Sequence, residues 1–148
     1  MNELEIVRLA DYEPPAFTTL HHDLTFDLQQ DHTLVTHNQQ FKRIQASVDE
    51  NGWAVELQKH LELDGEGLEL IEIAINDKAL SDNQWRYENN KLTLFNVADE
   101  FTLTTKVKIY PDDNKELSGL YRSNGVYCTQ CEAQGFRRIS FAQDRLMC

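Results

Sequence analysis

Cysteine is scarce in this sequence, with three residues among 148. Cys128, Cys131 and Cys148 are too few, and odd in number, for the disulfide framework of a small secreted domain. A chain of this length can bury a stable hydrophobic core without disulfide bonds. The cysteine usage therefore favours a reducing compartment, and we expect a cytoplasmic protein.

Basic residues and long apolar runs are also lacking. Lysine and arginine number 14 against 25 acidic residues, so the formal net charge is −11. Nucleic-acid binding needs a basic face, which this composition does not offer. No window approaches the roughly 20 apolar residues of a membrane span, and the N-terminus does not read as a signal peptide. We expect neither nucleic acid nor a membrane as partner, and a single domain over residues 1–148.

A pattern for a helix of three turns is missing before the last dozen residues, and short strand patterns fill the chain instead. In the first of them, Leu24, Phe26 and Leu28 alternate with polar residues and predict one buried face. Such strands joined by tight turns predict an all-β fold, an antiparallel, saddle-like β-sandwich with a short helix or coil over residues 133–148. The expected strand segments are 21–29, 33–48, 53–63, 68–76, 84–96 with an internal Asn-Asn turn, and 100–110.

Turn residues fix where these strands reverse. Asn51-Gly52 predicts a hairpin that leads into a long return strand over residues 53–63. The side-chain period slips once within residues 68–76, and a β-bulge explains such a slip. Residues 111–125 form the longest loop-like stretch, which ends in Asn124-Gly125.

Motifs for catalysis by this chain alone are absent. The sequence has no His-Glu-x-x-His, no Gly-x-Ser-x-Gly and no phosphate-binding glycine loop. His21, His22 and Asp23 offer acid-base groups or ligands, but alternation puts His22 on the opposite face from the other two, and a solvated strand start is favoured. The five histidines show no recognised metal spacing. We therefore assign no catalytic residue and no metal ligand.

The chain has a single Cys-x-x-Cys, at Cys128 and Cys131. A structural zinc site needs four ligands and a thioredoxin-like couple needs an α/β fold, so both uses are disfavoured. In a strand the two thiols point to opposite faces, while Gln130 and Glu132 share one face with Cys128. That amide and carboxylate form either a polar anchor for a ligand or the solvated face of an outer strand.

The segment around these cysteines resembles a known family. Cys-Thr-Gln-Cys-Glu-Ala followed by Gly-Phe-Arg, within residues 119–140, is similar to the segment near the end of the N-terminal β-domain of bacterial aminopeptidase N, a zinc-dependent gluzincin aminopeptidase. The stretches HHDLTFDLQQDHTLVT, INDKAL and FTLTTKVKIYP follow in the order expected for that domain. The resemblance covers nearly the whole chain but only the opening part of such an enzyme.

The resemblance implies roles for two residues. Glu132 would bind the free α-ammonium group at a peptide N-terminus, and Gln130 would line the pocket for the first residue. The partner would be the catalytic domain of the same family, which carries the zinc, the His-Glu-x-x-His motif and the Gly-x-Met-Glu-Asn motif. We therefore expect no cofactor in this chain and no activity from it alone.

The tail departs from the family pattern. Asp144 and Arg145 match, but Leu146 stands where the family has proline, and the sequence stops two residues later. The resemblance thus implies a domain that is incomplete at its C-terminal end, in a fragment or a truncated relative. Two other hypotheses remain open: a standalone β-sandwich that binds a partner without catalysis, and a zinc or redox protein that uses Cys128 and Cys131.

Overall fold

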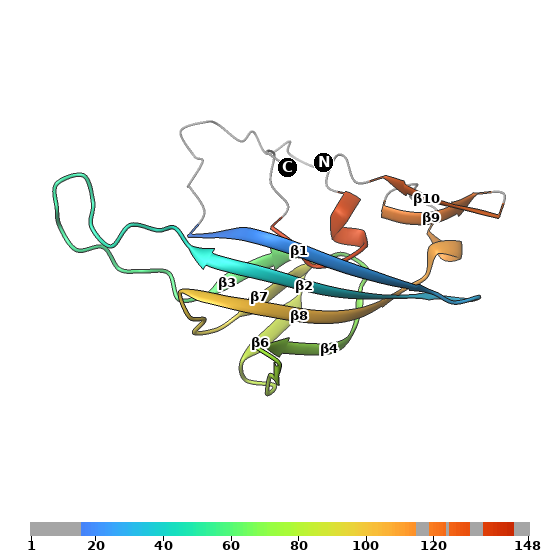
Figure 1. The fold of residues 1–148 in the computed structure, drawn as a ribbon, viewed down its shortest axis with the longest axis horizontal. Helices are drawn as coiled ribbons and strands as arrows, with labels where there is room; N and C mark the ends of the chain where they lie inside the picture. Colours follow the sequence, from blue (N-terminus) through green and yellow to red (C-terminus); the bar gives the residue numbers. More distant parts are fainter. Residues whose placement is uncertain (1–15, 115–118, 124, 131–134, 144–148) are drawn as a thin grey trace, which may run out of the picture.

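A computed structural model describes residues 16–114, 119–123, 125–130 and 135–143 (Figure 1). Its largest element is a five-stranded antiparallel sheet in the order β1-β2-β8-β4-β5. The bounds of these strands are β1 Phe17–Leu28, β2 Thr33–Arg43, β4 Glu69–Ile75, β5 Lys78–Ala79 and β8 Glu100–Ile109.

Two smaller antiparallel sheets complete the described fold. A three-stranded sheet has the order β3-β7-β6, with β3 Leu61–Asp64, β6 Trp85–Glu88 and β7 Lys91–Leu94. A separate hairpin pairs β9 (Gly119–Ser123) with β10 (Val126–Gln130). The described helical segments are two 3-10 turns, η2 (Pro111–Asp113) and η3 (Gly135–Arg138). The predicted all-β antiparallel fold, with a short helical segment near its end, is confirmed.

The core lies where the five-stranded sheet meets the three-stranded one. Along β2 and β8 every second residue is buried, as a strand with one covered face requires. The phenylalanines of β1, β2 and β8 meet there, with Phe101 against the rings of Phe17 and Phe41 at centroid distances of 6.1 and 5.4 Å. Burial of such rings is the main stabilising contribution, at roughly 25 cal/mol per Å² of apolar surface.

Several local predictions are confirmed. The pairing of β4 with β8 shifts register between Leu70 and Glu72, which is the expected bulge. Asn89 and Asn90 join β6 to β7 with φ of 52° and 61°, a left-handed geometry that asparagine tolerates better than most residues. Gly52 has a φ of 80° at the predicted Asn-Gly reversal.

Three local predictions are wrong. Phe26 and Leu28, which were predicted to be buried, are 40% and 50% exposed. Phe26 pairs with the buried Val35 of β2. β1, however, is an edge strand of the sheet and lies beyond the layer that covers β2 and β8. The return strand over 53–63 is β-structured only from Leu61 onward, apart from one bridge between Val48 and Ala54. Residues 111–125 are not all loop, because they contain β9.

Candidate functional site

Strand β10 carries Gln130, the described member of the predicted substrate-binding pair. Gln130 is exposed at the end of the strand and lies opposite Gly119 of β9. Cys128, two residues earlier on the same face, is half-buried with a free thiol. The predicted strand is therefore present as far as Gln130. Cys131 and Glu132 lie outside the described residues, so the alignment of Glu132 with Gln130 stays a prediction.

The β9–β10 hairpin is held to the rest of the molecule through Arg122. Its guanidinium lies 4.4 Å from the centre of the Tyr127 ring, and it also donates a hydrogen bond to the Tyr127 hydroxyl. Arg122 Nε is 3.3 Å from a carboxylate oxygen of Asp112 in η2. The Tyr127 hydroxyl in turn donates to the carbonyl of Gln29, 3.5 Å away in the β1–β2 turn. Both strands of the hairpin are thus linked to neighbouring elements.

Gly119 brings the hairpin into close contact with η3. Its φ is 75°, and a Cβ built there would lie 2.8 Å from Cβ of Arg138 and 3.3 Å from the carbonyl oxygen of Gly135. Only glycine combines this backbone geometry with this spacing. Because Gly119 is the register partner of Gln130, the end of β10 that carries Gln130 is the supported end of the hairpin.

An open groove of about 490 Å³ runs beside this supported end. Its floor is apolar, from Ile109 and Leu120, and its rim is polar. Arg138 and Glu66 both line the groove and form an ion pair with an N–O distance of 2.8 Å. The side-chain amide of Asn114 donates to the carbonyl of Leu120 at 3.0 Å. The Gln130 end of β10 and the polar residues beside it form a surface, which we call the supported ledge, that can orient a ligand. This surface does not bring together a set of reacting groups.

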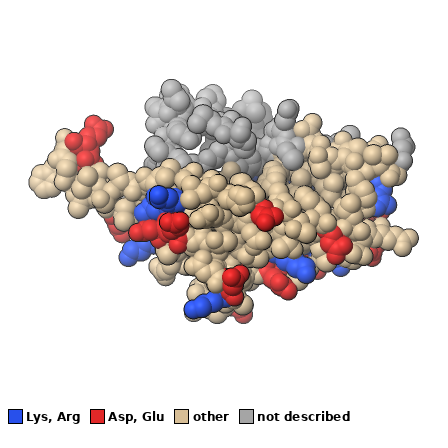
Figure 2. Space-filling model, in the orientation of Figure 1, with Lys and Arg blue, Asp and Glu red and all other residues tan. Residues whose placement is uncertain are grey.

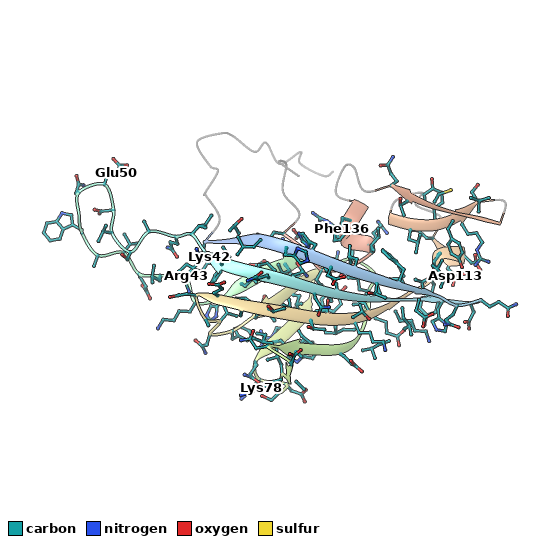
Figure 3. All side chains as sticks on the ribbon, in the orientation of Figure 1. Lys42, Arg43, Glu50, Lys78, Asp113 and Phe136 are labelled. Carbon is teal, nitrogen blue, oxygen red and sulfur yellow. The ribbon has the colours of Figure 1, made fainter. Side chains whose placement is uncertain are left out.

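A second polar cluster joins β1, β2 and the segment after η3. His22 Nδ1 lies 2.9 Å from His37 Nε2, and His37 Nδ1 lies 2.8 Å from the Ser140 hydroxyl. The two imidazoles stack at 5.1 Å. The ring of Phe136, which is labelled in Figure 3, packs edge-on against both. The expectation that His21, His22 and Asp23 form a solvated strand start thus misses a contact of His22.

Burial favours the neutral form of His37, whereas His22 is exposed on its edge strand. Desolvation, followed by repulsion from His22, lowers the pKa of His37 to about 3, and desolvation also lowers the pKa of His22. Ser140 is fully buried, so its hydroxyl is not placed to attack a substrate. The cluster instead ties the C-terminal segment to the large sheet through hydrogen bonds.

The signal for this contact was present in the alternation of the strands. His37 lies at a buried position of β2, and its pairing partner on β1 is Leu24. His22 lies two residues before Leu24 and therefore on the same face of β1. The pairing of β1 with β2 runs without a shift from Leu28 and Thr33 to His21 and Gln40, so the turn between the two strands sets this contact. The bulge between Thr19 and His21 lies beyond it.

Within the described residues, no three His, Cys, Asp or Glu side chains come together as a group that could hold a metal ion. No helix in the same part of the chain is long and apolar enough to cross a membrane.

The sequence is 40% identical to aminopeptidase N of Caulobacter vibrioides over 141 residues, which cover 95% of this chain and 15% of that protein. The chain is similar to the N-terminal region of aminopeptidase N. It therefore spans less than a sixth of the length of this curated relative. No protein-family profile matches the chain.

Solved structures agree with the similarity to aminopeptidase N. Aminopeptidase A of Legionella pneumophila, solved in complex with aspartic acid, superposes with a TM-score of 0.80 at 25% identity, covering 94% of this chain and 16% of that one. An M1 zinc metallopeptidase of Deinococcus radiodurans, solved as a mutant bound to a Tyr-Ser-Ala substrate, has a TM-score of 0.65 at 14% identity. That match covers 87% of this chain and 29% of that one, and it shows a shared fold.

Proposed function

We propose that this chain supplies the substrate-amine recognition of a zinc aminopeptidase that removes N-terminal amino acids from peptides. The observation that carries the proposal is the 40% identity with aminopeptidase N over 95% of the chain, an extent that includes β10 and Glu132. In this proposal Glu132 binds the α-ammonium group of the peptide, and Gln130 forms a wall of the pocket for the first residue.

The hairpin geometry supports this role. A carboxylate that faces an ammonium group in a partly dehydrated cleft forms a charge-assisted hydrogen bond, and the same carboxylate disfavours peptides with blocked amines. Recognition of the amine needs a strand end that does not move. Gly119 packs the Gln130 end of β10 against η3, and Arg122 fixes the hairpin to η2. A supported ledge of this kind holds binding groups in position.

The zinc and the general base belong, in this proposal, to a catalytic domain of the same family, which is the partner of this chain. The described residues do not fit a zinc site, because no three possible ligands come together among them. The facing ring nitrogens of His22 and His37 are 2.9 Å apart and share a hydrogen bond, which leaves no room for a metal ion between them. We accordingly propose that the chain alone is inactive.

A cytoplasmic location is supported by the sparse cysteines and the free thiol of Cys128.

A chimera tests the recognition role. The matching segment of the Caulobacter enzyme is replaced by this chain, and hydrolysis of alanine amides and dipeptides is measured. We expect activity in the chimera, and in its Glu132→Gln variant a kcat/KM lowered about 100-fold or more for free amines, since a charged hydrogen bond worth about 3 kcal/mol is lost. Glu62→Gln on the exposed side of β3 is the matched control and should have no effect. An active chimera that tolerates Glu132→Gln would refute the role of Glu132.

The inactivity of the isolated chain has its own test. The purified chain is supplied with zinc and assayed for release of an N-terminal alanine. We expect no turnover above the zinc blank. Robust turnover that disappears on Glu132→Ala would overturn this part of the proposal.

A further inference from the structure

A long arm, residues 44–60, projects from one end of the molecule between β2 and β3 (Figure 1). Its apolar side chains Ile44, Val48, Trp53 and Val55 are exposed, and Trp53 is 71% exposed. A tryptophan in water at the end of a projection leaves a large apolar area uncovered. Acidic atoms gather at the tip of the arm, where Glu50 points away from the sheets (Figures 2 and 3).

The tip of the arm is an ordered turn. One carboxylate oxygen of Asp49 accepts hydrogen bonds from the backbone amides of Asn51 and Trp53, each at 2.9 Å. The amide of Gly52 donates to the carbonyl of Asp49 at 3.0 Å, and the amide of Asp49 donates to the carbonyl of Trp53 at 2.9 Å. Because these bonds already order the backbone around Trp53, less conformational entropy is lost when the indole binds a surface.

The base of the arm is clamped to the body. Arg43 Nε donates to the Asp99 carboxylate at 2.6 Å, and its terminal nitrogen donates to the carbonyl of Gln58. Across the arm, the amide of Gln58 donates to the side-chain oxygen of Gln45 at 2.8 Å. The arm is therefore held by hydrogen bonds at its base and ordered by hydrogen bonds at its tip, where it presents Trp53.

An apolar groove of about 420 Å³ lies at the base of the same arm. It adjoins the arm directly, because the amide of Val97 donates to the carbonyl of Lys59 at 2.9 Å and the ring of Phe95 packs on His60 at 5.2 Å. Lys78 contributes a positive charge to its lining. The apolar residues that line it are Ile75, Ala79, Leu80, Phe95, Val97 and Ala98.

We propose that this chain forms a two-fold symmetric dimer in which Trp53 of each copy occupies the groove of the other. Each groove lies at the base of its own arm, so two arms packed antiparallel bring each tip to the base of the partner. The contact is then isologous and closes after two copies. The groove is larger than an indole ring, and its Lys78 matches the charges of Asp49 and Glu50 beside Trp53. This inference goes beyond the proposed function and does not depend on it.

The test is the mass of the full 148-residue chain by sedimentation equilibrium over a wide range of concentration. Each copy carries a net charge of −11, so the measurement is made near physiological ionic strength, where charges more than about 8 Å apart are largely screened. We expect a monomer–dimer equilibrium. Trp53→Ala should weaken dimerisation at least about tenfold, as expected for a central aromatic contact.

A charge exchange tests the groove itself. Lys78→Glu should weaken the dimer several-fold, and Lys78→Glu combined with Glu50→Lys should restore it. Val126→Ala is the matched control, because Val126 is an apolar residue that is 62% exposed on the other hairpin, and it should leave the dimer unchanged. Far-ultraviolet circular dichroism confirms that each variant keeps the fold.

Four outcomes would overturn the proposal. A chain that stays monomeric at every concentration has no such interface. A dimer that tolerates Trp53→Ala, or one whose charge exchange fails to restore it, uses a different surface. Growth beyond a dimer would show an open, head-to-tail contact in place of the two-fold pair.

Discussion

The two hairpins at opposite ends of the molecule share a turn sequence but differ in what supports them (Figure 1). The arm reverses at Asn51-Gly52, and the sequence between β9 and β10 contains Asn124-Gly125. Gly52 and Gly125 have nearly the same φ, 80° and 78°, and a Cβ on either would meet nothing within 4 Å. The same local signal is thus followed by one isolated bridge in the arm and by five residue pairs in β9–β10.

The difference comes from the packing of side chains beyond the turn. In β9–β10, Leu120 is buried and Arg122 links the hairpin to η2. Among the described residues, the contacts between the arm and the body lie near the base of the arm, as in the Arg43–Asp99 pair. A turn signal therefore decides where a chain reverses, while tertiary contacts decide how far the pairing extends and how firmly it is held.

Substitution of one glycine in each hairpin tests the contrast most strongly. Gly119→Ala should lower the free energy of unfolding by about 3 kcal/mol, because alanine meets both an unfavourable φ and Cβ of Arg138 at 2.8 Å. Gly52→Ala should cost only about 1 kcal/mol, since φ is its sole penalty. Urea unfolding measures the free energy of unfolding of both variants. Equal losses in the two would contradict the difference in support between the two hairpins.

Acid should weaken the side of the molecule that supports the β9–β10 hairpin. His37 bonds to Ser140, just after η3, and its pKa of about 3 in the fold lies below the value near 6.5 of the unfolded chain. The unfolded chain therefore takes up the proton first. The stability from neutral His37 is complete above about pH 6.5 and declines by about 1.4 kcal/mol per pH unit as the pH falls toward 3.

Urea unfolding at several pH values measures this slope. His37→Gln should flatten it between pH 6.5 and 3, and the comparison of variant with parent removes the shared contribution of the carboxylates. Parallel slopes for parent and variant would contradict the assignment.

The link between the hairpin and η2 has a smaller expected effect. Arg122→Gln removes the contacts with Asp112 and Tyr127 and should lower the free energy of unfolding by about 1 kcal/mol. Arg86→Gln removes a pair with Glu88 that is exposed on both sides, 3.6 Å apart, and should leave stability unchanged. Urea unfolding of the two variants side by side checks this, and similar losses would show that Arg122 does not support the hairpin.

The smallest effect on global stability is expected at the tip of the arm. Asp49→Ala removes the acceptor for two amides and should speed hydrogen exchange at Asn51 and Trp53 about fivefold, while the urea midpoint stays the same. Amide exchange followed by NMR measures the local effect. A shifted midpoint would mean that the arm contributes to the stability of the whole fold.

The sequence predicted much of the β-structure because its signals are local. Alternation in β2 and β8, the phase slip in β4 and the turns at Asn51-Gly52 and Asn89-Asn90 each depend on a few neighbouring residues, and the structure contains them all. The resemblance to aminopeptidase N likewise came from short motifs, and the sequence comparisons confirm it. Gln130 was placed correctly on a strand for the same reason.

The remaining features depended on residues far apart in the chain, which only the tertiary structure brings together. Phe26 and Leu28 are exposed on an edge strand. His37 forms hydrogen bonds with both His22 and Ser140. Gly119 packs against Arg138. Periodicity gives the face on which a side chain lies, but burial depends on whether another layer covers that face. Local sequence patterns therefore predicted most of the strands and turns. Packing decided which hairpin became the supported one that carries Gln130 and which became a projecting arm.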